Sequence, residues 1–179
     1  AEMALFQAEE KYRSIFENTI EGIFQTTPEG KYISANSALA RIYGYSSVEE
    51  LINSLTNISS ELYVEAGRRN EFVSLMEKND VVSGFESRIY RKDRSIIWIS
   101  ENVRAVRGRN GEVLYYEGTV EDIRDRHRHE EELRNSETLY HSLVETLPQN
   151  IFRKDLNEQF TFANQRFCQT LGRSLDEIV

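Results

Sequence analysis

The sequence predicts an α+β domain in which helices pack on one face of a five-stranded antiparallel sheet. Two short strand segments come first, a block of helical segments follows, and three longer segments with alternating hydrophobicity complete the unit. Short turns join the strands within each group, which indicates antiparallel pairing. Because the helical block must cross from the second strand to the third, we predict the strand order 2-1-5-4-3, flanked by an N-terminal helix and a connector helix.

An internal repeat marks the organisation of the chain. The segment YRSIFE at 12–17 returns as YHSLVE at 140–145, and Ala35-Asn36 returns as Ala163-Asn164. The offset, 140 − 12 = 128, is constant over about thirty-five residues, which is the signature of a duplicated unit. We therefore predict an N-terminal signalling helix, a complete unit, a connector helix and the beginning of a second unit, at residues 1–19, 20–123, 124–147 and 148–179.

The helix that leads each unit carries the same apolar stripe. A 3-4-3 spacing places its positions on one face of a helix. These positions are Leu5, Ala8, Tyr12 and Ile15 in the first helix, and Leu133, Ser136, Tyr140 and Leu143 in the second. We expect a helix seam in a homodimer, formed by Leu5, Tyr12, Ile15, Leu133, Tyr140 and Leu143.

The first unit opens with a hairpin. Strands are expected at 20–27 and 31–35, on either side of the turn Pro28-Glu29-Gly30. Asn36 is a good N-cap for the helix that follows, and Gly44 ends that helix.

The rest of the unit is helical and then extended. Ser46 or Ser47 caps a short helix, and a longer helix is expected at 64–78 with Phe72, Leu75 and Met76 on its inward face. Strands with a period of two follow at 83–91, 95–107 and 112–123. Their turns lie at 92–94 and 108–111, and Asn110-Gly111 is a strong hairpin signal.

Composition excludes several classes of function. A net charge of −8 argues against a nucleic-acid groove, which needs clustered positive potential. No segment approaches the roughly 20 apolar residues of a membrane span, and no signal-peptide pattern precedes the first helix, so we expect a cytoplasmic chain. A membrane anchor in a longer parent protein stays open. The single cysteine, Cys168, excludes an internal disulfide and a cysteine-based metal cluster.

Several short motifs follow one another in a fixed order. They are YRSIFEN at 12–18, Asn36 after the second strand, GYS at 44–46 with EEL at 49–51, RKD at 91–93 with Trp98, and Gly118 with EDI at 121–123. In this order they resemble the PAS family of sensory domains, and residues 140–179 resemble the first third of a second PAS domain. The resemblance implies signal perception or relay, joined by helices to an output module such as a histidine kinase or a cyclic-dinucleotide enzyme.

Two departures from the family pattern stand out. Arg124 takes the place of Thr in the usual Asp-Ile-Thr ending, and Arg94 takes the place of Gly in the usual Asp-Gly turn. A positive φ at Arg94 would carry a strain of about 1 kcal/mol or more, and a different turn type would avoid this strain.

Strand alternation and the analogy with PAS pockets assign side chains to the interior. The candidates are Phe24, Thr26, Ile33, Leu39, Ile42, Leu55, Phe72, Ile89, Ile99, Glu101, Val103, Tyr116 and Val120. They form either a packed apolar core or a small-molecule pocket. Glu101 favours the pocket slightly, because an inward carboxylate must be paired or neutral. A place for Glu101 at the sheet edge, or a bulge that shifts the register, stays open.

The known PAS cofactors do not fit these residues. A haem needs an axial ligand such as a core histidine, yet all three histidines lie in the connector. The thiol-adduct flavin subclass has a cysteine in the region that corresponds to 53–61, and this chain has none there. We predict no cofactor and no metal; a non-covalent flavin, which no residue supports, and an unidentified small molecule stay open. No catalytic constellation is apparent either, which favours a non-enzymatic module.

Two further sets of residues are candidates for relaying a signal and for binding a partner. Asp122 and Ile123 stand where the last strand meets the connector, and we predict that they relay the signal. A role of Asp122 as a simple helix cap stays open, and a cap at this junction would still affect transmission. The outward face of the sheet carries Tyr90, Trp98 and Tyr115, which suggests a surface covered by a helix or by a second protomer.

Overall fold

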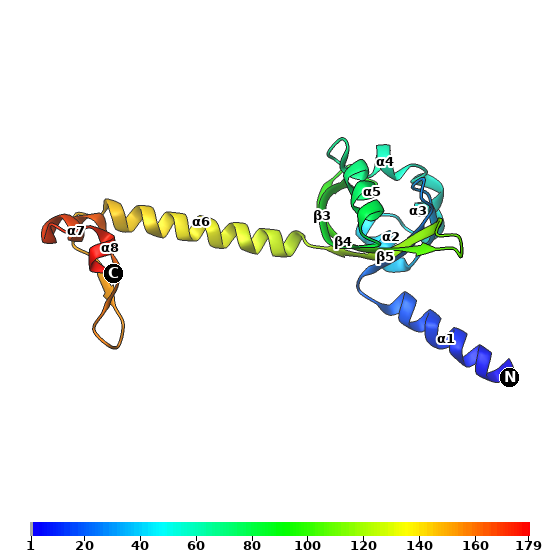
Figure 1. Ribbon diagram of the computed structural model, residues 1–179, viewed down its shortest axis with the longest axis horizontal. Helices are drawn as coiled ribbons and strands as arrows, with labels where there is room; N and C mark the ends of the chain where they lie inside the picture. Colours follow the sequence, from blue (N-terminus) through cyan, green and yellow to red (C-terminus); the bar gives the residue numbers. More distant parts are fainter. Residues whose placement is uncertain (1) are drawn as a thin grey trace. The chain divides into compact units, whose positions relative to one another are not determined.

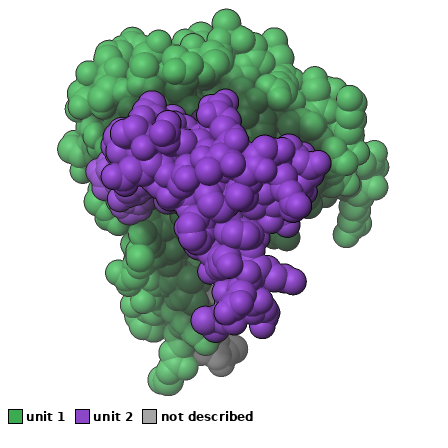
Figure 2. All heavy atoms as spheres, turned by 90° about the vertical axis from the view of Figure 1, so that its left-hand side faces the viewer, with its two compact units in different colours: residues 1–127 green, residues 128–179 purple. Residues whose placement is uncertain are grey.

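The computed structural model describes residues 2–179, without the side chains of residues 2, 4 and 5. The chain forms two compact units, residues 1–127 and 128–179 (Figure 2). The seam position Leu5 falls outside the described side chains. Within residues 2–179, no helix is long and apolar enough to cross a membrane.

The first unit is built on one antiparallel sheet (Figure 1). Its order is β2-β1-β5-β4-β3, which confirms the predicted order. The strands are β1 (Gly22–Thr26), β2 (Tyr32–Ala35), β3 (Val81–Tyr90), β4 (Ile96–Arg107) and β5 (Val113–Asp122).

Four helices cover one face of the sheet, and α1 (Glu2–Asn18) precedes it (Figure 1). They are α2 (Ser37–Tyr43), α3 (Val48–Ser54), α4 (Ile58–Glu61) and α5 (Arg68–Lys78). Asn36 caps α2 as predicted, because its side chain accepts the Leu39 N–H. Gly44 ends α2 at a φ of 83°, a backbone conformation that glycine tolerates.

The long helix begins later than the sequence pattern predicts. It starts at Arg68 instead of Val64, and Gly67 precedes it with a φ of 86°. The segment before Gly67 pairs with β3, since Tyr63 forms a bridge with Ile89 and the Val64 amide donates to the Arg88 carbonyl at 3.0 Å. Strand pairing therefore competes with helix formation over these residues and prevails.

The prediction that Ile33 faces the interior is wrong. It is 50% exposed, whereas Tyr32 is buried. The register between β1 and β2 shifts between Gln25 and Thr26, so that Thr26 faces Tyr32 while Gln25 faces Ser34. This β-bulge leaves Ile33 without a partner and turns it outward.

The other predicted inward residues lie in or against the core. Ile42 is partly buried and packs against the core. The fully buried ones are Phe24, Thr26, Leu39, Leu55, Phe72, Ile89, Ile99, Glu101, Val103, Tyr116 and Val120.

The second unit repeats the opening of the first. It contains most of α6 (Arg124–Thr146), then β6 (Phe152–Lys154), β7 (Phe160–Ala163), α7 (Gln165–Leu171) and α8 (Leu175–Ile178).

The repeat extends to individual hydrogen bonds. Asn36 donates to the carbonyls of Phe16 and Glu21 at 2.9 and 3.0 Å. Asn164 donates to the carbonyls of Val144 and Gln149 at 3.1 and 2.9 Å. Each pair of positions differs by 128, so the predicted duplication holds at the level of atoms.

Candidate functional site

A cluster of polar side chains lies buried between the sheet and its helices. Glu101 on β4 accepts a hydrogen bond from the Tyr63 hydroxyl at 2.9 Å. Arg69 on the first turn of α5 is 8% exposed, and Glu101 is 5% exposed. Among the residues that the structure describes, these two are the only buried side chains of charged type.

Burial controls the ionisation of Glu101. Removal from water raises the pKa of its carboxyl to about 7, while the Tyr63 hydrogen bond and the charges of Arg69 and Arg68 act in the opposite direction. Burial therefore favours the protonated form of Glu101 relative to that of an exposed glutamate.

Arg69 has no hydrogen-bonded counterpart for part of its charge. Its Nη2 atom is buried and donates to no hydrogen-bond partner among the described residues. The guanidinium carbon lies 4.9 Å from the ring centroid of Phe72 and 6.0 Å from that of Tyr116. These aromatic faces stabilise a cation weakly compared with a carboxylate.

Two more tyrosines belong to this buried cluster. The hydroxyls of Tyr32 and Tyr43 lie 3.4 Å apart, and burial raises the pKa of both phenols. The charge of Glu101 raises both pKa values further. We call Tyr32, Tyr43, Tyr63, Arg69 and Glu101 the core polar cluster.

Of this cluster, only Glu101 was predicted from the sequence to lie in the interior. Arg69 does leave a trace in the sequence, because it precedes Phe72 by three residues and Met76 by seven, on the inward face of α5. Tyr63 leaves none, since a strand bridge outside the main strands directs it.

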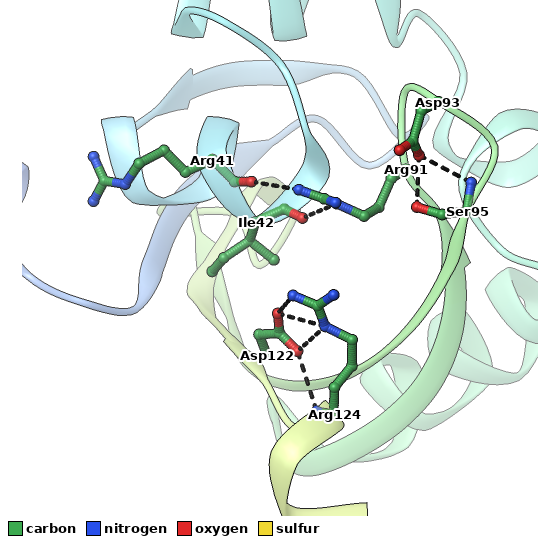
Figure 3. Close-up of polar contacts among 7 residues, drawn as sticks. All are labelled: Arg41, Ile42, Arg91, Asp93, Ser95, Asp122 and Arg124. Carbon is green, nitrogen blue, oxygen red and sulfur yellow. Dashed lines mark hydrogen bonds and ion pairs between the residues drawn. The ribbon is translucent and has the colours of Figure 1, made fainter. Parts of the chain in front are cut away.

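The junction of sheet and connector is built without a loop. The Asp122 carboxylate accepts the Arg124 amide at 3.1 Å and pairs with the Arg124 guanidinium at 2.6 Å (Figure 3). Ile123, between them, is 2% exposed, and its amide donates to the Trp98 carbonyl at 3.1 Å.

A second set of contacts fixes the first turn of α6 to the outward face of the sheet. The rings of His127 and Trp98 stack with centroids 4.4 Å apart. Glu86 on β3 pairs with Arg126 and lies 3.2 Å from Nε2 of His127. We call Glu86, Trp98, Asp122, Arg124 and His127 the junction contacts.

The predicted aromatic surface is not one cluster. Tyr90 pairs with Ile96, two residues from Trp98, so these two aromatics are neighbours. Tyr115 pairs with Val106, about 26 Å from Trp98 along β4 at about 3.3 Å per residue. The first turn of α6 packs on Trp98, whereas Tyr115 lies too far along the sheet to contact the same turn.

The hairpin between β3 and β4 is anchored to α2. Arg91 donates to the carbonyls of Ile42 and Arg41 at 3.0 and 3.2 Å, and Asp93 accepts the Ser95 amide at 2.9 Å (Figure 3). Arg94 has a φ of 67°, so of the two turn types that the sequence left open the strained one is present.

The first helix borders a groove on the outward face. Tyr12, Ile15 and Phe16 line it together with Gly118 and Thr119 of β5, and its volume is about 490 Å³. Within residues 2–179, no group of three or more His, Cys, Asp and Glu side chains is arranged to hold a metal ion.

A profile of the PAS domain matches residues 20–125, and a second PAS-domain profile matches residues 138–179. The chain belongs to the PAS domain family.

Solved PAS domains share this fold at low sequence identity. A PAS domain from Colwellia psychrerythraea is 24% identical, with a TM-score of 0.56 over 66% of this chain and 98% of that one. A domain of a sensory box sensor histidine kinase/response regulator from Geobacter sulfurreducens is 21% identical, with a TM-score of 0.51 over 66% of this chain and 96% of that one.

One curated relative places a similar segment inside a large protein. A probable diguanylate cyclase, DgcE of Escherichia coli, is 26% identical over 131 residues, which make up 70% of this chain and 11% of the relative. The chain thus spans about a tenth of that relative's length. Its PAS fold and this similarity support a sensor module.

Proposed function

We propose that this chain is a non-enzymatic sensory module that passes a change in the core of its first PAS domain along α6 to the second PAS segment. The observation that carries the proposal is the loop-free junction, where β5 ends at Asp122 and α6 begins at Arg124. A displacement of the end of β5 meets no flexible segment before it reaches the helix.

Short paths join the core polar cluster to the junction contacts. Glu101 and Trp98 are three residues apart on β4, about 10 Å along the strand. Phe85, which pairs with Glu101, precedes Glu86 on β3. Inward and outward side chains alternate on these strands, so a shift that the core imposes on β3 or β4 changes the contacts of His127.

The proposed setting is a larger cytoplasmic protein with a downstream output domain. A histidine kinase or a cyclic-dinucleotide enzyme is the output that we favour, and the similarity to a probable diguanylate cyclase supports the second choice. Neither activity is proposed for residues 1–179 themselves.

Hydrogen exchange of α6 tests the relay. At pH 8 the buried Glu101 is mostly ionised, and Glu101→Gln replaces it with a neutral side chain of the same shape. We expect amide exchange in residues 124–130 to slow at least threefold in this variant, because relief of the buried charge tightens β4 against its neighbours. Glu112→Gln, in the exposed hairpin, is the matched control. Equal exchange in all three proteins would refute the relay.

A second candidate function is a ligand-free scaffold for homodimerisation. The observation that favours it is the exposure of the seam residues, 67% for Tyr12, 63% for Ile15 and 67% for Tyr140. Apolar side chains at helical spacing that remain exposed in one chain are suited to a partner helix. The two functions are compatible, since a dimer seam also transmits helix rotation.

A further inference from the structure

We propose that Asn164 is the positioning residue through which α6 acts on the second PAS segment, and that Asn36 is its counterpart between α1 and the first PAS domain. The inference rests on the proposed relay and names the residue that receives it. Both asparagines are completely buried, at 0% exposure, and neither belongs to the junction contacts. They stand 128 residues apart, at the same place in the repeat.

The side-chain amide of Asn164 joins three elements at once. Its Nδ2 atom donates to the carbonyl of Val144, in the last turn of α6, at 3.1 Å. Its Oδ1 atom accepts the amide of Ile151, next to β6, and the amide of Phe167 in α7, both at 3.0 Å. Because the donor and the acceptor belong to one planar group, a displacement of the Val144 carbonyl is passed to β6 and α7.

The first unit repeats these bonds with Asn36. Its Nδ2 atom donates to the carbonyl of Phe16, in the last turn of α1, at 2.9 Å. Its Oδ1 atom accepts the amide of Ile23 in β1 at 2.9 Å and the amide of Leu39 in α2 at 3.0 Å. A helix leaves its last carbonyls without intrahelical partners, so Phe16 and Val144 are suited to accept from a side chain. The link between the leading helix and its unit is therefore a feature of the repeat.

Helix capping alone does not require an asparagine at these positions. A cap needs one side-chain acceptor, and serine, threonine or aspartate supplies it as well. Ser47, for example, caps α3 with its hydroxyl, which accepts the Glu50 amide at 3.1 Å. The donor atom of Asn36 and of Asn164 adds what a simple cap lacks, which is a bond to the preceding helix.

A glutamate at the end of each leading helix reinforces the link. Glu17 accepts the amide and the hydroxyl of Ser37 at 3.1 and 2.6 Å. Glu145 accepts the amide of Gln165, the equivalent residue at the start of α7, at 2.8 Å. The helix dipole favours a carboxylate at the start of α2 or α7, so these bonds hold the end of the leading helix there.

Apolar packing contributes little to this attachment in the second unit, all of which the structure describes. Ala163 and Asn164 are its only buried residues. The large apolar side chains near the end of α6 remain exposed, Tyr140 to 67% and Leu143 to 49%. The hydrogen bonds of Asn164 and Glu145 therefore determine how α6 meets β6 and α7.

A double-mutant cycle, read by NMR amide exchange of the 179-residue chain at pH 7, tests the proposal. Glu137→Gly loosens α6 directly, since glycine is unfavourable within a helix. We expect it to speed exchange of the Ile151 and Phe167 amides about threefold or more in the wild-type background. The carboxylate of Asn164→Asp still accepts these amides but cannot donate to α6. In that background the response to Glu137→Gly should fall below about 1.3-fold.

A purely structural role of Asn164 would make the two substitutions additive. An unchanged response to Glu137→Gly in Asn164→Asp would therefore overturn the proposal, and so would the absence of a response in the wild-type background. Asn157→Asp, in the exposed turn between β6 and β7, makes the same replacement and should keep the threefold response.

The glutamate link decides the question if Asn164→Asp does not fold. Glu145→Ala removes the bond to Gln165, whereas Glu145→Gln retains a side-chain acceptor. The response to Glu137→Gly should fall about twofold or more in the alanine variant and persist in the glutamine variant. Equal responses in these two variants would count against the link.

The cycle does not depend on the first PAS domain, because Glu137→Gly acts on α6 itself. The proposed relay is read separately, from the effect of Glu101→Gln on residues 124–130. A response at 124–130 without coupling at Asn164 would keep the relay and overturn Asn164 as its receiver. Coupling at Asn164 without a response at 124–130 would keep the receiver and refute the relay.

Discussion

The imidazole of His127 lies against the indole of Trp98 with ring centroids 4.4 Å apart and ring planes 16° apart. This contact joins the first turn of α6 to the outward face of β4. Trp98 and the buried Glu101 are three positions apart on this strand.

Removal of this stack should loosen the connector. His127→Ala loses an aromatic contact worth about 1 kcal/mol and the interaction with Glu86. We expect a change in Trp98 emission and a severalfold rise in amide exchange over residues 124–130. Trp98 is the only tryptophan of the chain, so the emission has a single source. His129→Ala, on the same helix, serves as the control, and an equal effect of both substitutions would argue against a specific stack.

Glu101 should make the stability of the first PAS domain depend on pH. Its carboxyl pKa is raised from 4.5 to about 7 on folding, so the folded state holds the proton more tightly than the unfolded state. The contribution of Glu101 to the free energy of unfolding is therefore largest below pH 4.5, and it is lost as the pH rises through about 7. The loss is about 3 kcal/mol by linkage at about 1.4 kcal/mol per pKa unit.

Urea unfolding of the wild type and of Glu101→Gln between pH 5 and pH 8 measures this dependence. The glutamine variant should be the more stable protein at pH 8, and the difference should shrink toward pH 5. Glu112→Gln controls for surface charge. A pH-independent difference between wild type and Glu101→Gln would show that burial does not perturb this carboxyl.

Glycine at position 94 should stabilise the hairpin. Arg94 holds a φ of 67°, which costs an L-residue about 1–2 kcal/mol and costs glycine almost nothing. Glycine loses more backbone entropy on folding, so we expect a net gain of about 0.5 kcal/mol in the free energy of unfolding. Arg109→Gly makes the same replacement in a turn where φ is not positive, and it should destabilise. A loss of stability in Arg94→Gly would contradict the expectation that the positive φ of Arg94 is strained.

Asn36 should be more sensitive to substitution than its small size suggests. It is fully buried, accepts the amides of Ile23 and Leu39, and donates to the carbonyls of Phe16 and Glu21. Asn36→Ala leaves these groups unpaired, and we expect a loss of about 3 kcal/mol in thermal or urea unfolding. Ser37→Ala is the neighbouring control and should cost about 1 kcal/mol, because it loses only the side-chain bond to Glu17.

Substitutions in the helix seam should change the oligomeric state. Replacement of Leu133, Tyr140 and Leu143 by serine should weaken a dimer at least tenfold, because the seam would lose its apolar contacts. Sedimentation velocity over a range of concentrations measures this effect. The double variant Glu131→Ser/Asn135→Ser alters the opposite face of the same helix and serves as the control. Unchanged sedimentation in the first variant would exclude the seam.

Hydrophobic period, turn residues and the repeat were enough to predict the strand order, the duplicated opening and most of the interior. The alternation along β4 placed Ile97, Ile99, Glu101 and Val103 on one face, and all four are buried. Such patterns are local, since a strand shows alternate faces wherever it pairs.

The errors arose where pairing between distant segments overrode the local pattern. A bulge opposite β1 turned Ile33 outward, and pairing with β3 delayed the start of α5 to Arg68. The grouping of Tyr115 with Trp98 failed because strand alternation gives a face and not a position along the sheet.

The sequence by itself determined the strand order and the duplicated unit, because periodicity and the 128-residue offset are written in residue order, and its ordered motifs carried the resemblance to PAS domains. Only the tertiary structure decided which polar groups share the interior. Arg69, Tyr63 and Glu101 come from separate elements, and their burial together depends on how those elements pack. Likewise, residue order put Asp122 beside Arg124, but packing alone brought His127 onto Trp98.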